Sequence, residues 1–157
     1  ININKSRTAE LAHQVIHRGV EVLAGNGTIE SFSVLPRLLR DHVVFENWEG
    51  THNVLCLQVT RDAARLDVHQ GFFRVLEQRL PQALIQPIAA EFDQAVATRD
   101  TLMARRVCAR MGSLILYAAL SQQNEPSIKP LASLFCHRHL SDNALNDSYK
   151  TLIEKAS

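Results

Sequence analysis

The sequence predicts an all-α protein, an up-down helical bundle with additional helices toward its C-terminal end. Apolar residues recur at spacings of three and four along most of the 157 residues, and no segment alternates between polar and apolar residues as a strand would. Glycine and proline are scarce, with six and five residues, which excludes collagen-like or linker character. A composition of 46% hydrophobic and 21% charged residues is typical of a globular domain.

The first predicted helix covers Thr8–Leu23, whose apolar residues form one broad stripe. The glycine-rich run Ala24–Gly27 is a strong signal for the end of that helix. A short helix over Arg37–Val44 follows, and Pro36 suits its first turn because proline has no N–H to leave unpaired there. The segment Phe45–Gly50 breaks the helical pattern, and we predict a turn.

The second part of the chain repeats this alternation of helix and break. Thr51 is a candidate N-cap for a helix over Asn53–Leu66. A short helix is predicted over His69–Leu80. The prolines Pro81 and Pro87 then bracket the start of another helix.

Asp100 opens the longest predicted helix, which runs to about Gln123. Within it, Met111–Leu120 has almost no polar face, so we expect this stretch to be the most buried and the helix to lie in the middle of the bundle. Two shorter helices, Ile128–Leu140 and Ala144–Ala156, complete the prediction. We divide the chain into residues 1–66 and 67–157, the second packing on the first in one continuous all-α unit.

Composition also excludes several classes of function. The 17 basic and 16 acidic residues leave a net charge of +1, which argues against a strongly basic nucleic-acid-binding protein. The longest nearly apolar run has about ten residues, too few to span a bilayer. Three widely spaced cysteines argue against a disulfide framework and fit a reducing compartment. Because the chain starts without Met, we expect it to be a piece of a longer protein.

Two short segments are candidates for a functional site. The run Leu23–Gly27 could bring backbone N–H groups close to a phosphate, or it could simply cap a helix. Glu49 lies between Trp48 and Gly50, where an apolar pocket would desolvate its carboxylate and make it a stronger base. The alternative for Glu49 is an ordinary surface glutamate in a turn.

We predict no metal site. His13 and His17 share a helical face, but Gln14 stands where the glutamate of an HExxH zinc motif would be. The segment Cys136–His139 has no second ligand pair at a zinc spacing. The arginines between residues 99 and 110 are expected to form a solvated face.

Three segments together resemble one family. The runs Val20–Gly27, Leu35–Asp41 and Asn47–Leu55 are similar, in order and separation, to the C-terminal helical domain of acyl-CoA dehydrogenases. The strong span is about Glu10–Arg65. The remaining residues, Leu66–Ser157, resemble more loosely the extra helical segment of the longer branch, which includes the alkylation-response flavoproteins.

The resemblance implies a fold, a cofactor and a reaction. In this family an N-terminal helical domain, a β-domain and a C-terminal four-helix bundle assemble into dimers or tetramers, and FAD lies between the β-domain and the bundle. The expected activity is oxidation of the Cα–Cβ bond of an acyl-CoA thioester in fatty acid metabolism, with electron-transfer flavoprotein or a similar acceptor as partner.

The resemblance also implies a location and a state for this chain. The expected location is the cytoplasm, or the mitochondrial matrix in a eukaryote. This chain alone would be incomplete and inactive, and it would self-associate through residues 8–23 or 53–66.

Matching the family motifs residue by residue assigns roles to two groups. Glu49 corresponds to the catalytic base, and Gly50 would lie against the thioester. The residues assigned to FAD are Thr51, His52 and Asn53 and, toward the FAD of a neighbouring subunit, Glu21, Val22, Leu23, Ala24 and Gly25. Three positions depart from the family pattern, because Glu21 replaces Gln, Ala24 replaces the first Gly and Thr28 replaces an aromatic residue.

Two other functions stay open at this point. The first is a flavoprotein of the same fold with a nucleic-acid-binding or protective role; the even charge balance argues against it, because nucleic-acid binding normally needs a basic stripe. The second is a helical oligomerisation module without activity, and the position of Glu49 within its motif argues against that.

Overall fold

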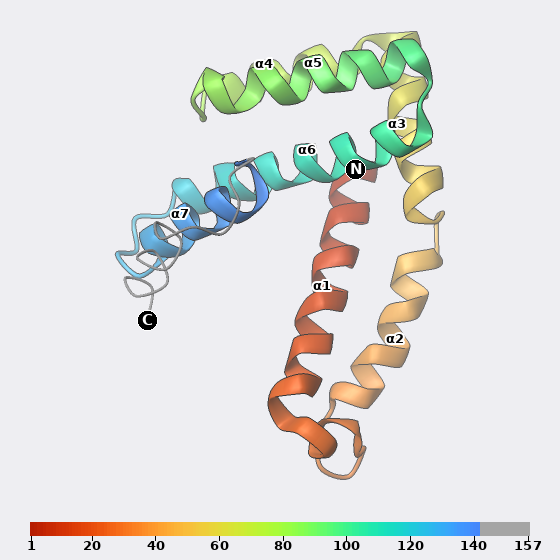
Figure 1. The fold of residues 1–157 in the computed structure, drawn as a ribbon, viewed down its shortest axis with the longest axis vertical. Helices are drawn as coiled ribbons and strands as arrows, with labels where there is room; N and C mark the ends of the chain where they lie inside the picture. Colours follow the sequence, from red (N-terminus) through yellow and green to blue (C-terminus); the bar gives the residue numbers. More distant parts are fainter. Residues whose placement is uncertain (142–157) are drawn as a thin grey trace. The chain divides into compact units, whose positions relative to one another are not determined.

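A computed structural model of the chain describes residues 1–141, and every regular element within them is a helix (Figure 1). The all-α prediction is therefore confirmed. The predicted helix over 144–156 lies outside the described residues. The elements are α1 (Asn2–Leu23), the short 3-10 helix η1 (Ala24–Thr28), α2 (Leu35–Asn47), α3 (His52–Leu66), α4 (Val68–Glu77), α5 (Gln82–Thr98), α6 (Thr101–Ser121) and α7 (Ile128–His139).

The chain divides into two compact units, residues 1–59 and residues 60–157, which we call unit 1 and unit 2. The boundary falls within α3. The division expected from the sequence, after residue 66, lies at the end of the same helix and stays a prediction. None of the helices in the described part of the chain is both long and apolar enough to cross a membrane.

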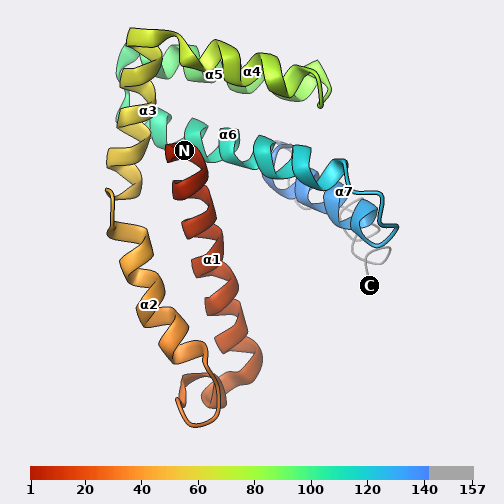
Figure 2. The ribbon, with the colours of Figure 1, turned by 180° about the vertical axis from the view of Figure 1, so that it is seen from behind.

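Unit 1 is built on the antiparallel pair α1 and α2, which lie side by side in both views (Figures 1 and 2). The connection between them starts with η1, and a glycine allows this tight path. A Cβ on Gly27 would lie 2.6 Å from the carbonyl oxygen of Val20, so only glycine fits against the end of α1. Near the other end of the pair, the Asn2 side-chain amide donates to Gln58 Oε1 at 3.1 Å.

Helix α2 begins and ends outside the predicted range. Pro36 lies in its first turn, as predicted. At the other end the helix continues to Asn47, because the N–H of Trp48 still donates to the carbonyl of Val44 at 2.9 Å. The predicted turn at Phe45–Gly50 is therefore too long, and the observed break is confined to the residues between Asn47 and His52.

Unit 2 has its centre at α6, which contacts α4, α5 and α7. Asp100 caps α6 as predicted, since its carboxylate accepts from the N–H groups of Leu102 and Met103 at 2.9 and 3.0 Å. Five of the ten residues of the predicted stretch are buried, namely Met111–Leu114 and Ala118, and the buried part of α6 starts earlier, at Ala104. It packs with buried residues of α5 around Phe92.

Two further predictions for unit 2 need correction. Helix α4 ends at Glu77, three residues before the predicted end at Leu80. Helix α5 starts at Gln82, between Pro81 and Pro87 as predicted, and Pro87 lies inside it. The arginines of α6 are also not simply solvated. Glu91 on α5, whose side chain is 11% exposed, accepts from Arg106 and Arg110 at 2.5 Å each. These two arginines therefore link α6 to α5.

Candidate functional site

The turn between α2 and α3 has an unusual backbone. Glu49 has a φ of 64° and Gly50 a φ of 124°, so two consecutive residues lie in the left-handed half of conformational space. This region is uncommon for a residue with a side chain, and such residues cluster at functional sites. The Glu49 side chain is exposed, so the turn presents its carboxylate at the surface.

Side chains and backbone of the helix pair hold this turn. Lys5 on α1 donates from Nζ to the carbonyl of Gly50 at 3.1 Å and to that of Glu46 at 3.4 Å. The N–H of Gly50 donates to the carbonyl of Asn47 at 3.2 Å. A Cβ on Gly50 would lie 3.2 Å from Cγ1 of Val54 and would be strained at this φ, so the position requires glycine.

A pocket of about 300 Å³ lies beside the turn, between α1 and α2. Its lining residues are Lys5, Thr8, Ala9, Ala12, His42, Phe45 and Trp48. Phe45 and Trp48 meet edge to face with ring centroids 6.1 Å apart, and the Trp48 residue is 55% exposed. Small residues and aromatic rings thus form an apolar surface directly before Glu49 in the chain.

The three residues after Gly50 continue from the turn into α3. Thr51 is exposed, and its carbonyl accepts from the N–H of Leu55 at 3.0 Å at the start of the helix. His52 is directed toward α1 and α2, because its Nδ1 lies 2.9 Å from Ser6 Oγ and its Nε2 lies 3.6 Å from Glu46 Oε1. Asn53 is exposed on the first turn of α3.

The second predicted group lies at the opposite end of α1. Lys5, which contacts Gly50, and Glu21 are 16 residues apart on α1, which corresponds to a rise of about 24 Å. The structure therefore does not bring the two groups together within one chain. Each residue of this segment is exposed, and Glu21 pairs with Arg18 at 2.5 Å. Ala24 has a φ of 50° and a ψ of −136°, a conformation that favours glycine.

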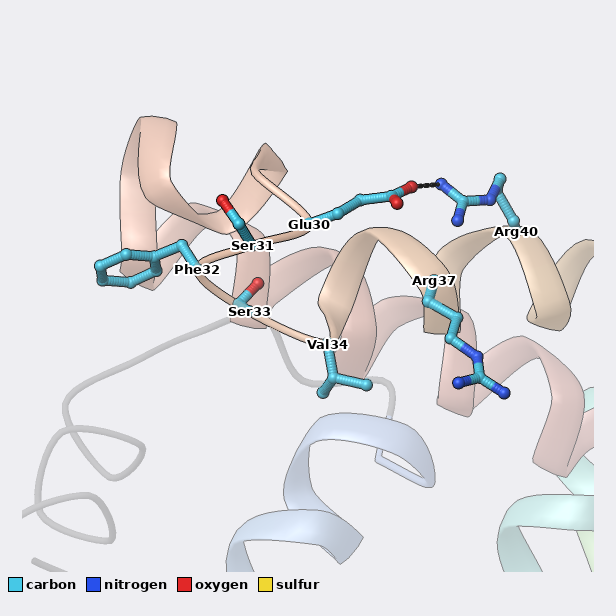
Figure 3. A pocket seen from close by; sticks show the side chains of 7 residues that line it. All are labelled: Glu30, Ser31, Phe32, Ser33, Val34, Arg37 and Arg40. Carbon is cyan, nitrogen blue, oxygen red and sulfur yellow. Dashed lines mark ion pairs between the residues drawn. The ribbon is translucent and has the colours of Figure 1, made fainter.

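A second pocket, of about 370 Å³, lies at this same end (Figure 3). The residues that line it are Glu30, Ser31, Phe32, Ser33, Val34, Arg37 and Arg40. Arg40 pairs with Glu30, as the figure shows, and Arg37 lies 3.6 Å from Asp41. Both guanidinium groups of this pocket are thus paired with carboxylates, and Ser33 Oγ donates to the carbonyl of Gly27 at 3.4 Å, so an anion would have to compete with these partners.

Several residues near the Glu49 turn were missed by sequence reasoning. Glu46 lies one turn of α2 after His42, on the same face, and both approach His13 of α1. The spacing of four between His42 and Glu46 was visible in the sequence. It was overlooked because the helix was predicted to end at Val44, which placed Glu46 in a turn.

Comparison with known proteins supports the resemblance for the first part of the chain. The family model for the acyl-CoA dehydrogenase C-terminal domain matches residues 1–64, which include both predicted groups of site residues. No match was found among curated proteins or among solved structures. Residues 1–64 of this chain are therefore similar to the acyl-CoA dehydrogenase C-terminal domain.

Proposed function

We propose that this chain forms part of an FAD-dependent acyl-CoA dehydrogenase in which Glu49 removes the α-proton of the acyl-CoA thioester. The observation that carries the proposal is the Glu49–Gly50 turn. Its two positive φ angles present a carboxylate beside an aromatic pocket, within the segment that matches the family. Asp67 and Arg99 also have positive φ, so the backbone alone does not set Glu49 apart; its position between Trp48 and Gly50 within the matched segment does.

The arginines at one end of unit 1 are groups that would contact the pyrophosphate of FAD in the proposed assembly. The pocket lined by Arg37 and Arg40 lies at the same end as the loop from Glu21 to Gly25, where the family approaches the cofactor of a neighbouring subunit, and there the pyrophosphate would replace Glu30 and Asp41 as the partner of the two guanidinium groups. The negative charge of Glu21 is paired with Arg18 and so need not oppose a pyrophosphate. At the other end, Thr51, His52 and Asn53 would lie toward the flavin.

In the proposed reaction, Glu49 accepts the α-proton while Gly50 lies against the thioester. The thioester carbonyl, polarised by hydrogen bonds, acidifies the α-carbon. An acyl chain that covers the turn would remove water from the Glu49 carboxylate and make it a stronger base. FAD, when bound, supplies the acceptor for the hydride that leaves the β-carbon.

The separation of the two groups along α1 supports a homo-oligomer. Since one end of α1 carries the proposed base and the other end carries the proposed cofactor loop, a single chain would serve two cofactor sites. The apolar side chains exposed on unit 1 could be covered in such an assembly. A dimer or tetramer, with electron-transfer flavoprotein or a similar acceptor, is the proposed working form.

The proposal is tested by replacing Glu49 with Gln in the complete flavoprotein. The amide keeps the shape of the side chain but cannot accept the proton, so flavin reduction by acyl-CoA should slow by about 10²–10⁴-fold while FAD content is retained. The rate is measured as anaerobic bleaching of the flavin absorbance after rapid mixing.

The matched control is Glu77→Gln, an exposed glutamate at the end of α4 in unit 2. It should reduce flavin at the wild-type rate. If Glu49→Gln also does so, the base lies elsewhere. If neither protein bleaches with any acyl-CoA but both assemble, the segment acts as a helical oligomerisation module.

A further inference from the structure

Three side chains of unit 1 converge from the two antiparallel helices. His13 comes from α1, and His42 and Glu46 come from one face of α2. Each offers one ligand atom, and these atoms all lie within 4.8 Å of one another. Glu46 Oε1 lies 3.9 Å from Nδ1 of His13 and 3.8 Å from Nε2 of His42.

Two histidine ring nitrogens in this cluster are buried and lack a hydrogen-bond partner among the described residues. Nδ1 of His13 and Nε2 of His42 have no hydrogen-bond partner in the described part of the chain. Their distances to Glu46 exceed hydrogen-bond length. The His42 residue is 5% exposed, so water has little access to its ring. Buried polar atoms in native proteins nearly always have a partner, and those that lack one call for an ion or a water.

We infer that His13, His42 and Glu46 bind a divalent transition-metal ion of the zinc class. Two imidazoles and one carboxylate are a ligand set found for Zn²⁺ in proteins, with metal–ligand bonds of about 2.0–2.2 Å. In a tetrahedral site with such bonds, ligand atoms are about 3.3 Å apart. The separations of 3.8 and 3.9 Å from Glu46 would close to that value with shifts of about half an ångström. The separation between the histidine ligand atoms, which is at most 4.8 Å, would have to close by up to about 1.5 Å through rotation of the two side chains.

His52 acts on this site as a positioning residue. Its Nδ1 lies 2.9 Å from Ser6 Oγ, and in the tautomer with the proton on Nε2 the Ser6 hydroxyl donates to Nδ1. Nε2 then faces Glu46 Oε1 at 3.6 Å and limits the rotation of that carboxylate. Hydrogen-bonded groups of this kind commonly orient the ligands of a metal.

Access and charge are compatible with a cation here. The His13 side chain is 42% exposed, and the pocket beside the Glu49 turn reaches His42, so an ion can enter from solvent. Lys5 also lines that pocket, but its ammonium group is engaged with the carbonyls of Glu46 and Gly50. A bound ion would tie α1 to α2 immediately before the turn that carries Glu49. This inference does not depend on the proposed function.

The test is calorimetric titration of the 157-residue chain with ZnCl₂, followed by Co²⁺ absorption spectra to report nitrogen and oxygen ligation. We expect one ion per chain, and a rise in the melting temperature with Zn²⁺ that MgCl₂ does not reproduce. His13→Gln and Glu46→Gln should each weaken Zn²⁺ binding by at least about 100-fold. Far-UV circular dichroism confirms that each variant is folded, which matters most for His42→Ala because that ring is buried.

The matched control is His17→Gln, which changes the next histidine on α1, exposed and stacked 6.4 Å from the His13 ring. Its Zn²⁺ affinity should stay within about twofold of wild type. Loss of binding in His17→Gln with retention in Glu46→Gln would mean a surface histidine pair instead and would overturn the proposal. Absence of one-to-one binding by the wild-type chain, or equal binding by wild type and Glu46→Gln, would overturn it as well.

Discussion

Units 1 and 2 differ in how far their large apolar side chains are buried. The largest fully buried side chains of the described residues all belong to unit 2: Phe92, Ile85, Ile88, Met111, Leu114, Val107 and Ser113. Unit 1, in contrast, buries the charged or polar residues Arg7 and His42. It leaves many large apolar residues exposed, among them Val15, Val22, Leu38, Val43, Val44, Phe45 and Trp48.

Unit 2 is therefore stabilised by its own apolar core, whereas unit 1 exposes apolar surface that a partner or a ligand would cover. Large apolar surfaces on a globular protein usually mark a site for a partner or a ligand. In unit 1 they accompany two pockets, a strained turn and an unsatisfied histidine cluster. Unit 1, which lies within the segment that matches the family model, thus has fewer large buried side chains than unit 2.

The largest expected effect compares one phenylalanine from each unit. Phe92→Ala removes a ring that is fully buried between α5 and its neighbours, and should lower the free energy of unfolding by about 3–5 kcal/mol. Phe32→Ala removes a ring that is 59% exposed and should change it by less than about 0.5 kcal/mol. Urea denaturation followed by circular dichroism measures both, and similar losses in the two variants would remove the contrast between the units.

A smaller effect is expected at the loop after α1. Ala24 holds φ at 50° and ψ at −136°, where its Cβ is strained and glycine is not. Ala24→Gly should therefore raise the free energy of unfolding by about 1 kcal/mol, despite the greater flexibility of glycine in the unfolded chain. The control is Gly25→Ala, where a Cβ meets nothing within 4 Å, and it should be nearly neutral. Destabilisation by Ala24→Gly would show that the loop is not strained in solution.

The smallest effect concerns two ionisable groups of unit 2. Burial raises the pKa of the Cys136 thiol above 9.0, although a hydrogen bond from Tyr117 opposes this. Burial likewise raises the pKa of Tyr117 above 10.0, and the neighbouring Cys136 charge and hydrogen bond add to that rise. Both folded-state groups hold their protons more tightly than in the unfolded chain, so stability should decline as pH increases above about 9.

Cys136→Ala tests this pair directly. The pKa of Tyr117 should fall but stay above its ordinary value, because burial is the largest cause of its shift. Tyrosinate absorbance during an alkaline titration reports the change, and Tyr117→Phe identifies which part of the signal belongs to this residue. An unchanged titration in Cys136→Ala would show that the two side chains do not interact.

Local signals in the sequence predicted much of the fold. Asp100 and Pro36 marked the starts of α6 and α2, since capping and proline geometry depend on a few adjacent residues. The end of α2 was wrong, because its last turn, through Phe45, presents apolar side chains to solvent and does not follow the expected pattern. The start of α5 was predicted between Pro81 and Pro87 and lies at Gln82, and packing around Phe92 outweighs the local cost of Pro87 inside the helix.

The candidate site was likewise predicted from the sequence only in part. Glu49 and Gly50 are adjacent in sequence, so their motif could be found without a structure. The left-handed backbone at Glu49 could not, because it depends on the turn geometry and on the hydrogen bonds from Lys5. The approach of His13 to Glu46 depends on the packing of α1 against α2, and no local pattern reports such a contact.

Residues 1–59 would form only part of the surface around each proposed FAD site. The 157-residue chain should therefore not bind FAD by itself. Titration of the purified chain with FAD, followed by flavin fluorescence, measures this most directly. We predict no saturable quenching, because burying a flavin requires surfaces from several sides. Quenching that saturates at low micromolar FAD would contradict the account, since it would mean that this chain alone provides a complete flavin site.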